Sequence, residues 1–294
     1  MNNNKTFWLV WGSIVLLSGI ALLLLYLGFI DYGITIFCIL PICIGIFTGV
    51  MPKKRKAVLG MAAALITLLL FLWATQLEGL VCIFLAIPVI ALFTLVGYII
   101  AIIIKRFKKK NDHLKISTIP FIVLLLAAGI DMCWKGTTAT DSVTTIIELP
   151  YPDSIVYNHI KKVDTVTATK SFLHQLGLPY PKKCILTTEQ KGGLRICEFE
   201  EGKIVETISD LRKNELLEMD ITSYDLAGQN WFSFKKDIYQ IKKDSRLTVI
   251  SRTTTYSSRL KPRLYWKWIE ETTIEAEQTL VFKNLKNELA AQSY

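Results

Sequence analysis

Acidic residues are scarce in the first 135 positions of this 294-residue sequence, which hold 12 Lys or Arg but only 4 Asp or Glu. The remaining positions are nearly balanced, with 22 basic and 21 acidic residues. The formal net charge of +9 therefore arises in the first part, where the basic residues flank apolar runs. Because this pattern differs from the basic surface typical of nucleic-acid-binding proteins, we expect no nucleic-acid partner.

Patterns that bind metals are also missing. The sequence has three His, and neither a CxxC nor a His-x-x-x-His spacing occurs. Four of the six cysteines lie in apolar runs, where Cys behaves as a small hydrophobic residue: Cys38, Cys43, Cys82 and Cys133. No loop motif of a cofactor-binding site is present. We therefore expect neither a metal site nor a cofactor.

Long uncharged runs dominate the first part of the chain. The composition is 51% hydrophobic and 20% charged, with a mean hydropathy of +0.37. About 20 apolar residues suffice for a helix to cross a bilayer. The runs predict an α-helical multi-pass membrane domain in residues 1–135, with five transmembrane helices at about 7–30, 34–51, 57–77, 80–104 and 116–134. The fifth is the shortest, and it spans only if Asp131 lies near its end and Trp134 at the interface.

The charges of the loops predict an orientation. The loops at 53–56 and 105–115 are rich in Lys and Arg, whereas the loops around Asp31 and Glu78 contain none. Because short basic loops stay in the cytoplasm, we expect a multi-pass protein of the cytoplasmic (plasma) membrane with its N-terminus inside. Five spans place residues 136–294 outside the cell. If the fifth run does not cross, the same rule places them in the cytoplasm.

After a polar linker at 136–142, the hydrophobic pattern changes period. Two short helices are expected near 153–163 and 168–176. Strands are expected at 143–149, 183–189, 194–200, 203–210, 215–222, 232–242 and 246–256, and Gly202 lies in a two-residue turn. Residues 262–291 contain no Gly and no internal Pro, which indicates one long helix. We therefore expect an α+β helix-grip domain at 143–294, a seven-stranded antiparallel sheet around a long C-terminal helix.

Three motifs in this part resemble a membrane-anchored branch of the SRPBCC superfamily (START-like, polyketide cyclase/dehydrase and lipid transport). The first is LHQLGLPYP at 173–181, and the second is RICEFEEG at 195–202. The third is TTY at 254–256 with Arg259, Leu260, Pro262, Tyr265 and Trp266. The resemblance covers about residues 143–291. It implies a pocket for an apolar or amphipathic small molecule between the sheet and the last helix.

Candidate site residues follow from this expectation. Ligand contacts are predicted for Arg195, Trp231, Phe234, Tyr239, Arg252, Trp266, Trp268 and Ile274, and plain core packing is the alternative for the apolar ones. Glu198, Glu206 and Tyr256 are candidates for acid–base catalysis, since a carboxyl group facing an apolar cavity has a raised pKa. The acidic residues Glu270, Glu271, Glu275 and Glu277 are interpreted as a solvated helix face.

Three functions remain open at this stage. The first is a membrane-tethered binder of a hydrophobic or lipid-like ligand, with membrane lipids and an apolar small molecule as partners. The second is a cyclase/dehydrase-type enzyme, and the third is an envelope protein-interaction module without a ligand. Two further alternatives also stay open. Cys184 and Cys197 form a disulfide or remain buried thiols, and residues 265–268 pack in the core or rest on the bilayer surface.

Overall fold

The computed structural model describes residues 3–75, 79–107, 113–133, 138–226, 231–244 and 247–291. The chain divides into two compact units. The N-terminal unit comprises Met1–Thr137 together with Arg259–Trp266, and the C-terminal unit comprises Thr138–Ser258 together with Lys267–Tyr294. Each unit has its own hydrophobic core.

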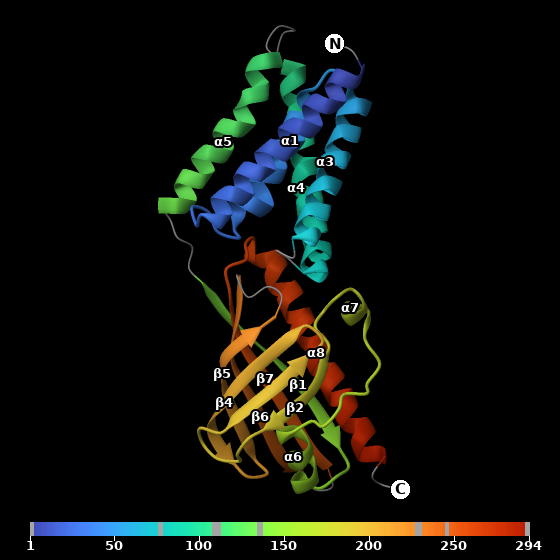
Figure 1. Cartoon of the computed structure of the whole chain (residues 1–294), viewed down its shortest axis with the longest axis vertical. Coiled ribbons are helices and arrows are strands. Elements are labelled where there is room, and N and C mark those ends of the chain that lie inside the picture. Colours follow the sequence, from blue (N-terminus) through green and yellow to red (C-terminus); the bar gives the residue numbers. More distant parts are fainter. Residues whose placement is uncertain are drawn as a thin grey trace. The chain divides into compact units, whose positions relative to one another are not determined.

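All the secondary structure described in residues 3–133 is helical (Figure 1). Its elements are α1 (Asn3–Tyr26), the π-helix η1 (Thr35–Ile39), α2 (Leu40–Val50), α3 (Lys54–Ala74), α4 (Leu80–Phe107) and α5 (His113–Cys133). Three helices among the described residues are long and apolar enough to cross a membrane: Asn4–Tyr26, Lys54–Ala74 and Leu80–Arg106. The second and fifth predicted spans correspond to shorter apolar helices at Thr35–Val50 and Ile119–Asp131, and Trp134 lies outside the described residues.

Two glycines allow α2 and α4 to pack closely. A Cβ atom on Gly45 would lie 2.0 Å from the backbone oxygen of Thr94, and one on Gly97 would lie 2.1 Å from that of Ile42. Any larger residue at either position would force the two backbones apart. Close helix crossings of this kind are typical of helices packed in a membrane, where small residues let backbones approach.

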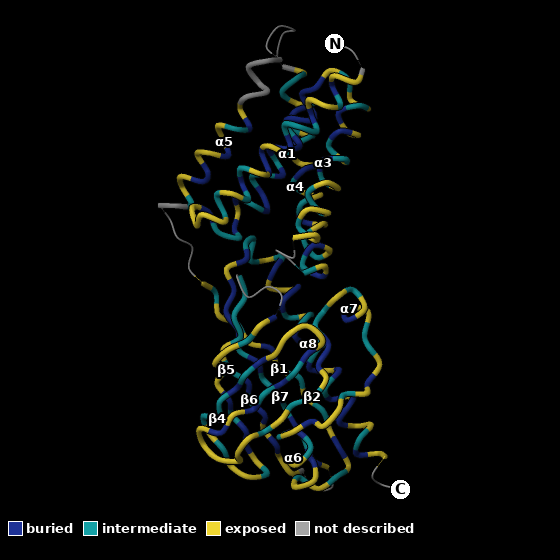
Figure 2. The backbone as a smooth tube through the Cα atoms, viewed as in Figure 1, coloured by how far each residue is buried: buried dark blue, intermediate teal, exposed yellow. Residues whose placement is uncertain are grey.

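The C-terminal unit is built on one antiparallel sheet of seven strands in the order β1-β7-β6-β5-β4-β3-β2. The strands are β1 (Ala139–Leu149), β2 (Pro181–Leu186), β3 (Leu194–Phe199), β4 (Gly202–Arg212), β5 (Leu216–Asp225), β6 (Phe232–Asp244) and β7 (Leu247–Ser258). Buried residues alternate with more exposed ones along β4 and β7 (Figure 2), because one face of the sheet covers the core. A tight turn joins β3 and β4 as predicted, but its two residues are Glu200 and Glu201, and Gly202, with φ +113°, is the first residue of β4, paired with Phe199.

Three helices accompany the sheet: α6 (Asp153–Lys161), α7 (Phe172–Gln175) and the long α8 (Arg263–Ala291). The sheet curls around α8 in Figure 1. The main core of this unit joins α6, α8 and the sheet through side chains that include Tyr157, Ile208, Met219, Ile250 and Phe282. This arrangement is the predicted helix-grip fold.

The alternative left open for the two cysteines of this unit is now resolved. Cys184 on β2 and Cys197 on β3 are directly opposite each other in the strand register. Their sulfur atoms form a disulfide. It ties the edge strand β2 to the rest of the sheet.

Candidate functional site

The interior of the helix grip contains an ion pair between neighbouring strands. Arg195 on β3 lies opposite Glu206 on β4, and its Nη1 atom donates to Glu206 Oε2 at 2.6 Å. Both side chains are almost completely buried. Nη2 of Arg195 donates to the backbone oxygen of Ile160 at the end of α6, at 3.3 Å. The pair therefore connects the sheet to α6.

A second group of charges links β6, β7 and α8. Arg252 donates from Nε to Asp237 Oδ2 at 2.9 Å and from Nη1 to Glu277 Oε2 at 2.9 Å. Asp237 is fully buried, whereas Glu277 keeps slight contact with solvent. One guanidinium group thus bridges a strand carboxylate and a helix carboxylate, a geometry that the fork of Arg donors suits.

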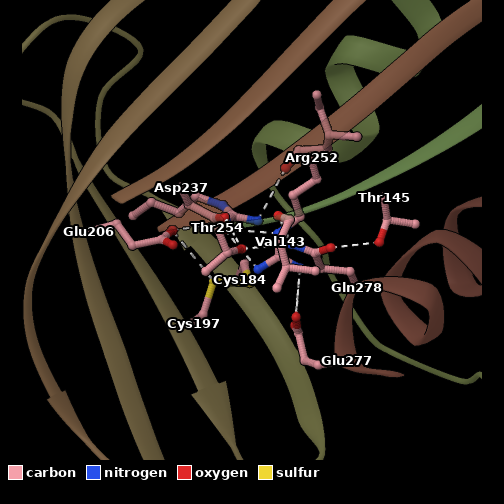
Figure 3. Close-up of polar contacts among 12 residues, drawn as sticks. Val143, Thr145, Cys184, Cys197, Glu206, Asp237, Arg252, Thr254, Glu277 and Gln278 are labelled. Atoms are coloured by element: carbon pink, nitrogen blue, oxygen red, sulfur yellow. Dashed lines mark hydrogen bonds and ion pairs between the residues drawn. A yellow bond between two sulfur atoms is a disulfide. The ribbon is translucent and has the colours of Figure 1, made fainter. Parts of the chain in front are cut away.

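Neutral polar side chains extend this network, as Figure 3 shows. Thr254 donates its hydroxyl to Asp237 Oδ1 at 2.5 Å, and Gln278 Nε2 donates to the Thr254 hydroxyl at 2.8 Å. On the other side of Gln278, its Oε1 accepts from the Thr145 hydroxyl at 2.6 Å. The buried amide of Gln278 is therefore satisfied on both ends, which fixes the rotation of α8 against the sheet.

Tyr239 on β6 lies between the two guanidinium groups. The centre of its ring is 5.7 Å from Arg195 Cζ and 5.3 Å from Arg252 Cζ, within the range of cation–π attraction. Burial raises the pKa of the Tyr239 hydroxyl to about 12, although both Arg residues act in the opposite direction. The phenol is therefore neutral at physiological pH.

Three carboxyl groups share two guanidinium groups in this network. Burial raises the pKa of Glu206 and of Glu277 above the usual range, against the attraction of Arg195 and Arg252 respectively. Burial alone would lower the pKa of both arginines, but the neighbouring carboxylates outweigh it and raise them.

A small cleft opens between α6 and α8. It has a volume of about 270 Å³, including space open to solvent, and it encloses room for no more than about one water molecule. Its lining residues come from α6, the segment after it, β6 and α8: His159, Ile160, Val163, Tyr239, Val281, Asn284, Leu285 and Glu288. Through Ile160 and Tyr239, the base of the cleft adjoins Arg195.

Other predicted residues form an aromatic cluster that adjoins the network through Val143, whose backbone oxygen accepts from Gln278 Nε2 at 3.3 Å. Tyr256 and Ile274 are buried together with Val143, and Phe234 packs against them. Phe232 stacks on Tyr256 with ring centres 5.0 Å apart, and the Trp231 ring meets Phe232 edge-on. These residues pack against one another between the sheet and α8.

The remaining predicted residues lie outside the interior. Glu198 is partly exposed and pairs with Lys183 at 3.2 Å. Trp266 is buried in the N-terminal unit, where its ring centre lies 4.8 Å from that of Phe37. Trp268 is 63% exposed.

Sequence reasoning missed Asp237, Thr254 and Gln278, and it was wrong about two of the acidic residues on α8. Glu270 is buried and accepts a hydrogen bond from Ser258 Oγ at 2.5 Å, and Glu277 binds Arg252. The reason is helical geometry: positions 270, 274 and 277 fall on one face, and the apolar Ile274 shows that this face is buried. Glu275 is on the exposed face, as expected, and Glu271 is partly exposed.

No family model and no curated protein matches this sequence. Among solved structures, the chain is similar to a START superfamily protein from Mycobacterium smegmatis, with a TM-score of 0.37 and 11% identity over 51% of this chain and 98% of that one. It is also similar to Ara h 8.0201, with a TM-score of 0.36 and 9% identity over 52% of this chain and 99% of that one. Protein Ms6760 from Mycobacterium smegmatis gives a TM-score of 0.37 and 9% identity over 53% and 98% of the two chains.

At these similarity scores, the strand order and the terminal helix carry the assignment of the fold. The C-terminal unit therefore has the helix-grip arrangement, a seven-stranded antiparallel sheet with a long terminal helix.

Proposed function

We propose that this protein is a membrane-tethered binding domain that takes up a hydrophobic or lipid-like small ligand at the cleft between α6 and α8. The cleft is the observation that supports this function. It combines apolar walls from Ile160, Val281 and Leu285 with polar groups at its edge, the composition typical of small-molecule sites.

The polar edge of the cleft sets the orientation of such a ligand. Asn284 is anchored, since its Oδ1 accepts from the backbone of Thr167 and its Nδ2 donates to Glu288, each at 2.8 Å. Burial raises the pKa of Glu288. A hydroxyl or protonated polar group of the ligand is suited to this edge, with its hydrocarbon directed towards Leu285 and Tyr239.

The tether is the helical N-terminal unit. We propose five membrane spans, with the N-terminus in the cytoplasm and the C-terminal unit outside. Two observations support this orientation: the basic residues of the loops at 53–56 and 105–115, and the disulfide between Cys184 and Cys197. Structural disulfides persist mainly in oxidising, extracytoplasmic compartments.

Photo-crosslinking tests the ligand site. The purified full chain is incubated with a long-chain fatty acid that carries a diazirine, irradiated and digested, and the labelled peptides are identified by mass spectrometry. We expect labelled peptides from residues 156–163 and 281–288. Labelling confined to the helices of the N-terminal unit would overturn the proposed site.

A matched pair of variants controls for non-specific labelling. Val281 lines the cleft and is half-buried, whereas Lys283 on the same helix is exposed. Val281→Trp fills the cleft and should reduce labelling of the 281–288 peptide several-fold. Lys283→Trp adds the same bulk on the other side and should leave labelling unchanged.

A second function, an interaction module that needs no ligand, is favoured by the packed interior. The aromatic cluster and the charged network fill the space between sheet and helix among the described residues. Absence of fatty-acid labelling from the C-terminal unit, with the fold intact by circular dichroism, would favour this alternative. The cyclase-type alternative has less support, because Glu206 is bound to Arg195 and Tyr256 lies in the aromatic cluster.

A further inference from the structure

Two large apolar side chains are exposed at the start of α8. Leu264 is 93% exposed and Trp268 is 63% exposed. Residues four apart on a helix lie one above the other on the same face. The next position on that face is the exposed Thr272, so the apolar surface is limited to the first two turns.

The segment just before and within the first turn belongs to the N-terminal unit. The Tyr265 hydroxyl donates to the backbone oxygen of Leu85 in α4, and the ring of Trp266 packs on Phe37 in η1. Leu85 lies five residues after the start of α4, or about 7.5 Å along the helix. Residues 259–266 are thus held at the ends of the apolar helices.

The same end of the N-terminal unit has a further contact with this segment. Arg259 Nη1 lies 3.9 Å from Oδ1 of Asp31. Asp31 is in the loop between α1 and η1. This loop and the residues before α4 contain no Lys or Arg, the pattern of the extracytoplasmic side. With the orientation proposed above, the first turn of α8 lies at the depth where a span meets the outer headgroup region.

We propose that Leu264 and Trp268 insert into the outer membrane–water interface and so anchor the start of α8 to the lipid surface. This inference rests on the membrane tethering proposed above, but not on the ligand site. Trp is enriched at that interface because its ring is apolar while its N–H can still bond to water or headgroups. A bilayer as the occupant explains why two such side chains are exposed immediately beside span ends.

Site-specific photo-crosslinking tests the anchor in the full chain, reconstituted into vesicles of phosphatidylethanolamine and phosphatidylglycerol. p-Benzoylphenylalanine replaces Leu264 or Trp268 in separate variants, and lipid adducts are detected by mass spectrometry after irradiation. Leu70 on α3 is 56% exposed and serves as the control for membrane insertion. Phe172 on α7 is 70% exposed and serves as the control for a surface residue away from the span ends.

We expect lipid adducts at 264, 268 and 70, with several-fold lower yield at 172. Adducts at 70 but not at 264 or 268 would overturn the anchor while leaving membrane tethering intact. No adducts at 70 would overturn the tethering and the anchor together. Equal yields at 172 and 268, or adducts from 264 and 268 to a second protein chain instead of lipid, would also overturn the anchor.

Discussion

Arg195 and Glu206 face each other across adjacent strands with 2.6 Å between Nη1 and Oε2, and both are buried. A buried ion pair of this kind gains little net stability over an apolar pair, because both ions lose their hydration. Replacing only one of the two residues is costly, because the charge of the other is then left buried without a partner. The pair therefore makes the packing of this end of the sheet sensitive to either single substitution.

Arg195→Met should lower the free energy of unfolding by about 3–5 kcal/mol, because Glu206 remains buried without its partner. Chemical unfolding of the detergent-solubilised full chain, followed by the β-sheet signal in circular dichroism, measures the change. The double variant Arg195→Met with Glu206→Met should recover most of the loss. A double variant as unstable as the single one would contradict the pairing.

Glu277→Gln should lower the free energy of unfolding by about 1–3 kcal/mol, because it weakens a charge-assisted hydrogen bond with Arg252. Glu275→Gln is the matched control: it lies two residues away on the exposed face, and its change should stay within about 0.5 kcal/mol. The same unfolding titration compares the two variants. Equal effects would show that the inward placement of Glu277 is wrong.

Reduction of the Cys184–Cys197 disulfide should destabilise the C-terminal unit. The bond closes a loop with a sequence separation of 13, and loops of that size contribute about 3 kcal/mol through the restricted unfolded chain. Thermal unfolding with and without dithiothreitol measures the loss. The Cys184→Ser, Cys197→Ser double variant should unfold at the temperature of the reduced wild-type protein. Dithiothreitol should not change that temperature.

His174 predicts a pH dependence of stability. Burial, and to a lesser degree Lys170, lower its pKa below the ordinary value of 6.5, and Nδ1 lies 2.7 Å from the Ser171 hydroxyl. The unfolded chain therefore binds more protons than the folded one once the pH falls below 6.5, and stability decreases with acidification. Unfolding titrations from pH 7.5 downwards should show this decrease in the wild type, and His174→Gln should reduce it. An identical pH profile for the variant would rule out this assignment.

A reporter fused after Tyr294 tests the orientation. With five spans, an alkaline phosphatase fusion should be active and a green fluorescent protein fusion dark, because the C-terminal unit is outside the cell. Fusions after residue 56, in the basic cluster at the start of α3, should give the opposite result. Cytoplasmic activity at the C-terminus would show that the run at 116–134 does not cross.

Local patterns were sufficient to predict the seven strands and the long last helix. Alternating polarity, the turn signal at Glu201–Gly202 and the absence of Gly and Pro after position 262 each act over a few residues. The apolar runs likewise indicated the helical N-terminal part, and three helices in the described part of the chain are long and apolar enough for a span. The order of the sheet followed the chain because successive strands form hairpins from β2 to β7.

The site depended on contacts that no local pattern encodes. Asp237, Arg252 and Glu277 come from three elements and meet only because α8 lies in one rotation against the sheet, fixed by Gln278. Sequence alone determined the elements and their apolar faces, since these follow from the spacing of neighbouring residues. Only the tertiary structure decided that charges fill the interior and that Trp266 belongs to the N-terminal unit, because burial and pairing depend on residues distant in the chain.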